Sequence, residues 1–118
     1  MTTKTVLGTT VYGEPSGNYD GSSQDWYSDS VTAANYYRGR GGVQTITFSL
    51  LDFVGTMVLE ACLDADPAAA NWFTTFTYSS NAPGSYLFPE TITGNFTWMR
   101  VRVEGFDDGT ITSVTITY

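Results

Sequence analysis

The chain has 118 residues, of which 42% are hydrophobic, 15% aromatic and 14% charged, a composition that fits one compact domain and excludes a disordered chain. Its formal net charge of -7 would repel phosphate backbones, so we expect no nucleic-acid partner. With no histidine and one cysteine, the chain can form neither a Ser-His-Asp or Cys-His catalytic site nor an internal disulfide.

Segments in which apolar and polar side chains alternate recur along the chain, and almost no window shows the spacing of an amphipathic helix. The alternation predicts eight short strands, at residues 5–12, 30–37, 43–51, 56–64, 72–80, 90–94, 96–105 and 110–118. Gly, Pro, Asn and Asp fill the segments between them, and "DPAAAN" (66–71) has room for one helical turn. We therefore expect a single all-β domain over residues 1–118, an antiparallel β-sandwich or jelly roll with an aromatic, Gly- and Ser-rich N-terminal third (1–42) and core strands over 43–118.

The alternation also assigns side chains to faces. Those expected to form the core are Ile46, Phe48, Leu50, Met99, Val101 and Val103. The segment 56–64 is apolar on both faces, which is typical of a central strand. Cys62 lies within it and is expected to be a buried side chain instead of a reactive thiol.

The turn before the last predicted strand has the chemistry of a tight hairpin. Asp-Gly in "FDDGT" (106–110) lies between two alternating segments, so we predict that 96–105 and 110–118 pair directly through it. Asp107 and Asp108 then have a structural role. Neither "DDG" (107–109) nor "DAD" (64–66) extends into a calcium-binding loop, so we expect no metal.

Nothing in the inventory of residues points to catalysis. Twelve acidic residues without paired-carboxylate spacing are typical of a solvated surface, and "RGRGG" (38–42) lacks the strand and helix context of a phosphate-binding loop. We expect no enzymatic activity and no cofactor. The chain has no apolar leader segment and no run of 18 apolar residues, so we expect neither a signal peptide nor a membrane span.

Two groups of side chains are candidates for binding. Arg100 and Arg102 share the polar face of their strand, where they would pair with Glu60 or an aspartate, or stack on Trp98. Aromatic residues gather in the N-terminal third, at Tyr19, Trp26, Tyr27, Tyr36 and Tyr37. These rings either form a binding surface or cover the open end of a small sandwich, and the sequence leaves both interpretations open.

Two stretches, "FVGTMVLEACLDADP…NWF" (53–73) and "TGNFTWMRVRVEGFDDGTITSVTITY" (93–118), resemble small β-sandwich modules in structural proteins of tailed bacteriophages, particularly the cyanophages of marine cyanobacteria. The likeness covers roughly the C-terminal two thirds, and residues 1–42 have no counterpart in it. The matching framework residues are Gly55, Trp72, Phe73, Phe96, Trp98 and Arg100. The chain holds one copy of the pattern and no stalk, which favours a compact decoration, neck or tail-accessory protein over a fibre.

The resemblance implies a non-enzymatic virion protein that is made in the host cytoplasm and docks on capsid or tail proteins. A homotrimer at local three-fold positions is the oligomer we expect. The candidate interface residues are Trp26, Tyr27, Tyr36, Tyr37, Trp98, Arg100 and Arg102. The same rings fit an alternative function, a carbohydrate-binding module for host-surface glycans, and a third hypothesis is an accessory protein that acts inside the infected cell.

Overall fold

The computed structural model describes residues 2–34 and 42–118, and it confirms the all-β prediction. Eight strands form one sheet in which every pairing is antiparallel. The strands are β1 (Thr3–Leu7), β2 (Thr10–Val11), β3 (Trp26–Tyr27), β4 (Val31–Thr32), β5 (Val43–Cys62), β6 (Phe73–Ser80), β7 (Ser85–Thr93) and β8 (Trp98–Thr117). One 3-10 helix, η1 (Pro67–Ala69), fills the turn expected in "DPAAAN", and the Asp66 side chain accepts a hydrogen bond from the Ala68 N–H at its start.

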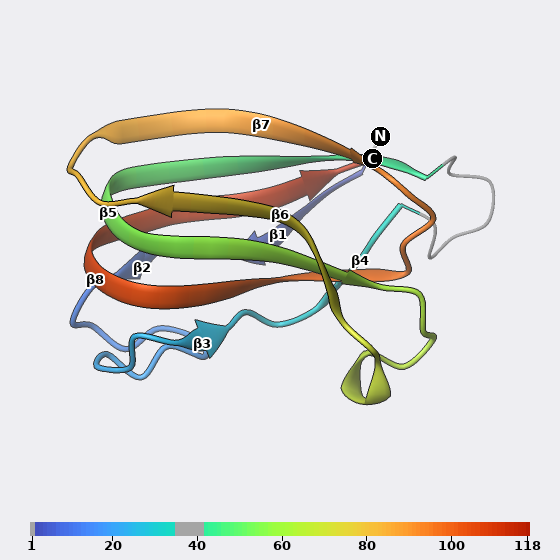
Figure 1. Cartoon of the computed structure of the whole chain (residues 1–118), viewed down its shortest axis with the longest axis horizontal. Helices are drawn as coiled ribbons and strands as arrows, with labels where there is room; N and C mark the ends of the chain where they lie inside the picture. Colours follow the sequence, from blue (N-terminus) through green and yellow to red (C-terminus); the bar gives the residue numbers. More distant parts are fainter. Residues whose placement is uncertain (1, 35–41) are drawn as a thin grey trace.

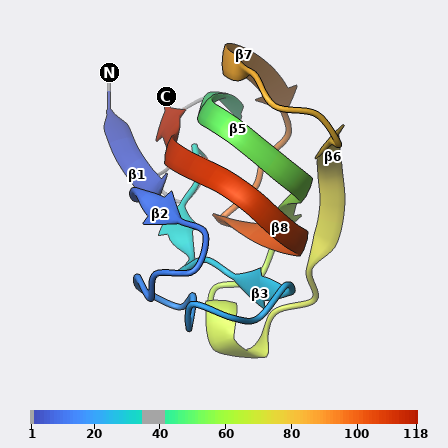
Figure 2. The same ribbon diagram turned by 90° about the vertical axis from the view of Figure 1, so that its left-hand side faces the viewer.

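The two longest strands fold the sheet onto itself. β5 and β8 have 20 residues each, and both turn back at the same end of the molecule (Figure 1). The first half of β5 pairs with β7 and with the second half of β8, while its second half pairs with β6 and with the first half of β8. The result is a sandwich of two layers, which we call the upper layer (β1, β2, β7 and the adjoining halves of β5 and β8) and the lower layer (β3, β4, β6 and the other halves). Figure 2 shows both layers from the folded end.

The predicted hairpin at residues 106–110 is wrong. Phe106–Gly109 lie inside β8, where the chain turns back from one layer to the other, and each half of β8 pairs with β5 and not with the other half. Likewise 43–51 and 56–64 are two halves of β5, joined at a corner where the register shifts between Leu51 and Val54. An Asp-Gly pair supplies the positive φ that either a hairpin or a corner needs, and the matching bend of β5 beside β8 makes it a corner.

At this corner the two strands are in backbone contact. Asp52 has φ 54°, and Gly109 has φ 88°. A Cβ atom on Gly109 would lie 2.1 Å from the Asp52 carbonyl oxygen, so a side chain has no room there. The Asp52 carboxylate also accepts a hydrogen bond from the Gly84 N–H (3.0 Å), which ties the β6–β7 loop to the corner.

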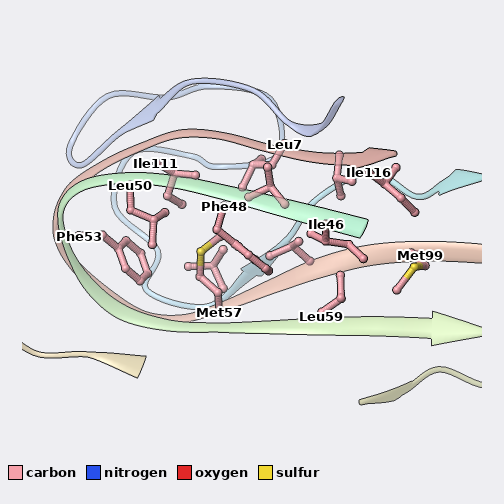
Figure 3. Close-up of a cluster of buried hydrophobic side chains, with 14 of the residues drawn as sticks. Leu7, Ile46, Phe48, Leu50, Phe53, Met57, Leu59, Met99, Ile111 and Ile116 are labelled. Atoms are coloured by element: carbon pink, nitrogen blue, oxygen red, sulfur yellow. The ribbon is translucent and has the colours of Figure 1, made fainter. Parts of the chain in front are cut away.

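The core lies between the layers, and the six predicted core side chains are all buried in it. Figure 3 shows Ile46, Phe48, Leu50 and Met99 among the side chains between the layers. Met57, Leu59 and Ala61 join them from the second half of β5, whose outward residues are buried too. Cys62 is a buried free thiol, as expected.

Other predicted boundaries shift. The segment 5–12 divides into β1 and β2, with Gly8 and Thr9 between them in neither strand. The segment 90–94 belongs to the longer β7, which begins at Ser85. Of the predicted strand 30–37, Val31 and Thr32 form β4, Ser30, Ala33 and Ala34 are in no strand, and residues 35–37 lie outside the described part. Two-residue β3 was not predicted at all.

Candidate functional site

The outward face of the lower layer brings together aromatic and charged side chains from distant parts of the chain. In the strand register Glu60 of β5 lies opposite Arg100 of β8, and Arg102 lies opposite Tyr27 of β3. Trp72 joins them from the end of the loop that precedes β6. We call Tyr27, Glu60, Trp72, Arg100 and Arg102 the aromatic–arginine surface.

Glu60 is the electrostatic centre of this surface. It is 4% exposed, and its carboxylate accepts hydrogen bonds from Arg100 Nε (2.8 Å) and Arg102 Nη1 (3.0 Å). A buried carboxylate is tolerated when cations of this kind pair with it. The predicted cross-strand pairing of the arginines with Glu60 is therefore confirmed.

Arg100 is held by rings as well as by charge. Its Cζ atom lies 4.3 Å from the ring centroid of Tyr27 and 4.3 Å from that of Trp72, both within the range of cation–π attraction. The two rings come from opposite sides of the central strand pair, since β3 borders β8 and β6 borders β5. The guanidinium thus has a fixed position before any partner arrives.

Trp98, which the sequence analysis offered as a stacking partner for the arginines, has another contact. Its Nε1 donates a hydrogen bond to the Ala65 carbonyl oxygen (3.1 Å). Thr97 Oγ1 donates to the Asp64 carbonyl oxygen (2.7 Å), and the Asn71 N–H donates to the Asp64 carboxylate (3.0 Å). These bonds hold the 63–72 loop against the start of β8 and so place Trp72 over Arg100.

The arginines' charge is largely compensated at this surface. Arg102 Nε lies 2.7 Å from a carboxylate oxygen of Glu104, in addition to its bond to Glu60. Two cations therefore face two carboxylates, and the surface presents rings and a fixed guanidinium with little net charge. Such a surface suits non-covalent contact with a protein or a flat polar ligand.

Trp26 does not belong to this surface, which corrects the sequence-based expectation. It is 6% exposed, and its ring packs 5.3 Å from that of Tyr19 and 6.2 Å from that of Phe106, centroid to centroid. Successive side chains of a strand point to opposite faces, so Trp26 turns into the core while Tyr27, 46% exposed, turns outward. Tyr19 and Trp26 pack against Phe106 at the folded end of the sandwich, so these two rings have a structural role, although the end that they cover is not the open end that the sequence analysis considered.

Of the other candidates, Tyr36 and Tyr37 lie outside the described residues. Trp72 was not named as a binding residue. The sequence did mark this residue, since Trp72 opens the predicted strand 72–80 directly after a Pro- and Ala-rich loop. The direction in which the Trp72 side chain points could not be predicted from the sequence, because the hydrogen bonds of the 63–72 loop determine it.

One carboxyl in the N-terminal loop has a strongly perturbed environment. Asp20 accepts hydrogen bonds from the Ser23 hydroxyl (2.6 Å) and from the backbone N–H groups of Ser23 (2.7 Å) and Ser22 (2.8 Å). These donors, the Ser23 hydroxyl first, hold the pKa of Asp20 well below its ordinary value. Their role is to tighten the turn that leads the chain toward β3.

A scan against protein-family models found no family that matches the chain, and a search of curated proteins found no matching sequence. Within residues 2–34 and 42–118, no helix is long and apolar enough to cross a membrane. In the same residues no group of His, Cys, Asp or Glu side chains is placed to hold a metal ion.

Proposed function

We propose that this chain is a non-enzymatic structural protein of a tailed-phage particle, a capsid decoration or a neck or tail accessory protein. It docks on other virion proteins through the aromatic–arginine surface. The observation that carries the proposal is the fixed position of Arg100, bonded to buried Glu60 and in contact with the rings of Tyr27 and Trp72. Arg, Tyr and Trp are the residue types that dominate binding energy at protein interfaces.

Preorganisation supports the proposal energetically. Immobilising a flexible side chain on binding costs about 0.5 to 1.5 kcal/mol, and Arg100 has already lost that freedom in the folded chain. Tyr27 keeps enough exposed ring to bury against a partner. A particle also presents many equivalent sites, so avidity strengthens a contact that is weak for one copy.

The geometry favours docking over the carbohydrate-binding alternative. Arg100 covers part of the rings of Tyr27 and Trp72, and Trp26 is buried in the core. Fewer ring faces therefore remain for stacking on a sugar than the sequence indicated. Quenching of tryptophan fluorescence by one of a panel of cell-surface glycans would restore the carbohydrate-binding function.

The first test is quantitative mass spectrometry of purified particles of the phage that encodes the chain. A copy number near that of the major capsid protein is expected for a decoration protein, and a few copies per particle for a neck or tail protein. Absence of the chain from the particles would contradict the virion function and favour an accessory role in the infected cell.

The second test locates the docking surface on the chain. Tyr27→Ala should weaken association with purified particles at least about tenfold, the loss typical of an interface hot spot. Tyr12→Ala is the matched control, because Tyr12 is 43% exposed but lies in the N-terminal loop beside Phe106. Folding of both variants is checked by thermal unfolding. Equal affinity of Tyr27→Ala and wild type for the particle would show that docking uses another surface.

A further inference from the structure

Three edges of the sandwich carry features that prevent another strand from pairing with them. β1 contains Lys4 and a bulge after Thr5. β7 contains Pro89 and Glu90, and β3 and β4 have only two residues each. Charges, prolines, bulges and short length are the devices by which natural sheets avoid edge-to-edge association.

The fourth edge, β6, has a different character. Its sequence "FTTFTYSS" holds eight residues without a charge or a proline. Within the described residues it pairs with β5 alone, so one row of its backbone N–H and C=O groups faces outward. A register shift opposite Leu59 and Glu60 interrupts its beginning and leaves Phe76–Ser80 in regular pairing with Gly55–Leu59.

We propose that β6 is the edge through which two copies of this chain join, by antiparallel pairing of Phe76–Ser80 with the same segment of the second copy. The lower layers of the two copies then form one continuous sheet. With Tyr78 at the two-fold axis, Thr77 of each copy lies opposite Ser79 of the other. Because the described part of each chain has one such edge, the assembly closes at two copies.

A second copy fits this edge chemically. Phe76 and Tyr78 are partly buried and pack against the core, whereas Thr77 and Ser79 point outward and are exposed. Pairing β6 with itself keeps this alternation, so on the inner face Tyr78 meets Tyr78 with Phe76 opposite Ser80, and on the outer face hydroxyls meet hydroxyls. The chain carries a net charge of -7, and like-charged copies approach most easily along a strand without charged side chains.

The inference is independent of the proposed docking function, because β6 contributes no residue to the aromatic–arginine surface. It predicts a two-fold pair in place of the homotrimer expected from a three-fold lattice position. The docking proposal and the dimer proposal can fail separately, since binding to the particle and self-association of the chain are measured in different experiments.

The test is the molar mass of the purified chain, measured by sedimentation equilibrium over a range of concentrations. Wild type should approach twice the mass of the chain. Thr77→Lys with Ser79→Lys should raise the dissociation constant at least about tenfold, because like charges then lie directly opposite across the new strand pair. The matched control is Thr5→Lys with Thr91→Lys, which adds the same two cations to exposed threonines on β1 and β7 and should leave the dimer intact.

A charge-swap experiment separates loss of the interface from loss of folding. The Thr77→Lys, Ser79→Lys variant, called the Lys pair, is mixed with a Thr77→Glu, Ser79→Glu variant. The opposite charges should restore a dimer that contains one copy of each variant. Wild type that stays monomeric up to about 1 mM, or that forms a trimer, would overturn the proposal, as would a Lys pair that still dimerises. If the Lys pair does not fold, hydrogen exchange of wild type decides: the amides of Phe76–Ser80 must exchange more slowly as concentration rises, and unchanged rates contradict the pairing.

Discussion

At Gly109 the backbone of β8 passes so close to that of β5 that only a hydrogen atom fits between them. The Asp52 carbonyl oxygen occupies the place that a Cβ atom would take, and the φ of 88° already disfavours any L side chain. Gly13 has nearly the same φ, 86°, but nothing lies within 4 Å of its missing Cβ. Substitutions at the two glycines therefore separate the loss of stability caused by the positive φ from the loss caused by the close backbone contact.

Gly109→Ala should lower the free energy of unfolding by about 3 kcal/mol, because the corner must open as well as accept a strained φ. Gly13→Ala should lower it by about 1 kcal/mol, the cost of the positive φ alone. Urea unfolding of both variants measures the difference. Equal losses would mean that the corner adapts to a methyl group without strain.

At the scale of single elements, the two residues of β3 have different roles: one stabilises the core, and the other belongs to the aromatic–arginine surface. Trp26 pairs opposite Val103 and points into the core, and Tyr27 pairs opposite Arg102 and points outward. Around Phe106, at the folded end, the buried rings of Tyr19, Trp26 and Phe53 form one aromatic cluster. Stability and binding should therefore respond to different residues of the same strand.

Trp26→Ala should lower the free energy of unfolding by about 3 to 5 kcal/mol, as large-to-small changes of buried aromatic residues do. Tyr27→Ala should lower it by about 1 kcal/mol, since it removes a cation–π contact and an exposed ring. Chemical denaturation of the two variants, with the m-value checked for two-state behaviour, compares them. A larger loss for Tyr27→Ala than for Trp26→Ala would contradict the facing described for β3.

For the whole molecule, long-range pairing holds the sandwich together and net charge opposes it. β5 and β8 pair from Thr45 opposite Thr117 to Cys62 opposite Trp98. The two ends of the chain lie together (Figure 1), and the Tyr118 N–H donates to the Thr2 carbonyl oxygen (2.9 Å). The charge of -7 repels itself in the compact state. Local ion pairs such as Glu60 with Arg100 act in the opposite sense, but they are partly buried and are screened less by salt.

Raising the ionic strength from about 0.01 M to 0.15 M should therefore increase the urea midpoint, because the Debye length falls from about 30 Å to 8 Å and self-repulsion weakens. Exchanging Glu14 and Asp107, two exposed acids, for Gln and Asn should reduce this salt dependence. The measurement is made at a protein concentration low enough to keep the chain monomeric. A midpoint that falls with salt would show that ion pairs outweigh the repulsion.

The alternation of side chains was sufficient to predict the all-β class, the buried row of Ile46, Phe48 and Leu50, and the outward face that Arg100 and Arg102 share. These features depend on period-two geometry, which is local and therefore visible in the sequence. The neighbouring strand β5 decided that Asp107–Gly109 bends between the layers instead of closing a hairpin.

Tertiary structure also decided the direction of Trp26 and the position of Trp72. Alternation says which residues share a face of a strand, but the partner strand determines which face is inside. Trp26 turns inward because β3 pairs with β8, and Trp72 reaches Arg100 because the 63–72 loop is bonded to the start of β8. The open edge of β6 likewise exists only once all other strands have found their neighbours, since an edge is a property of the assembled sheet and of no single segment.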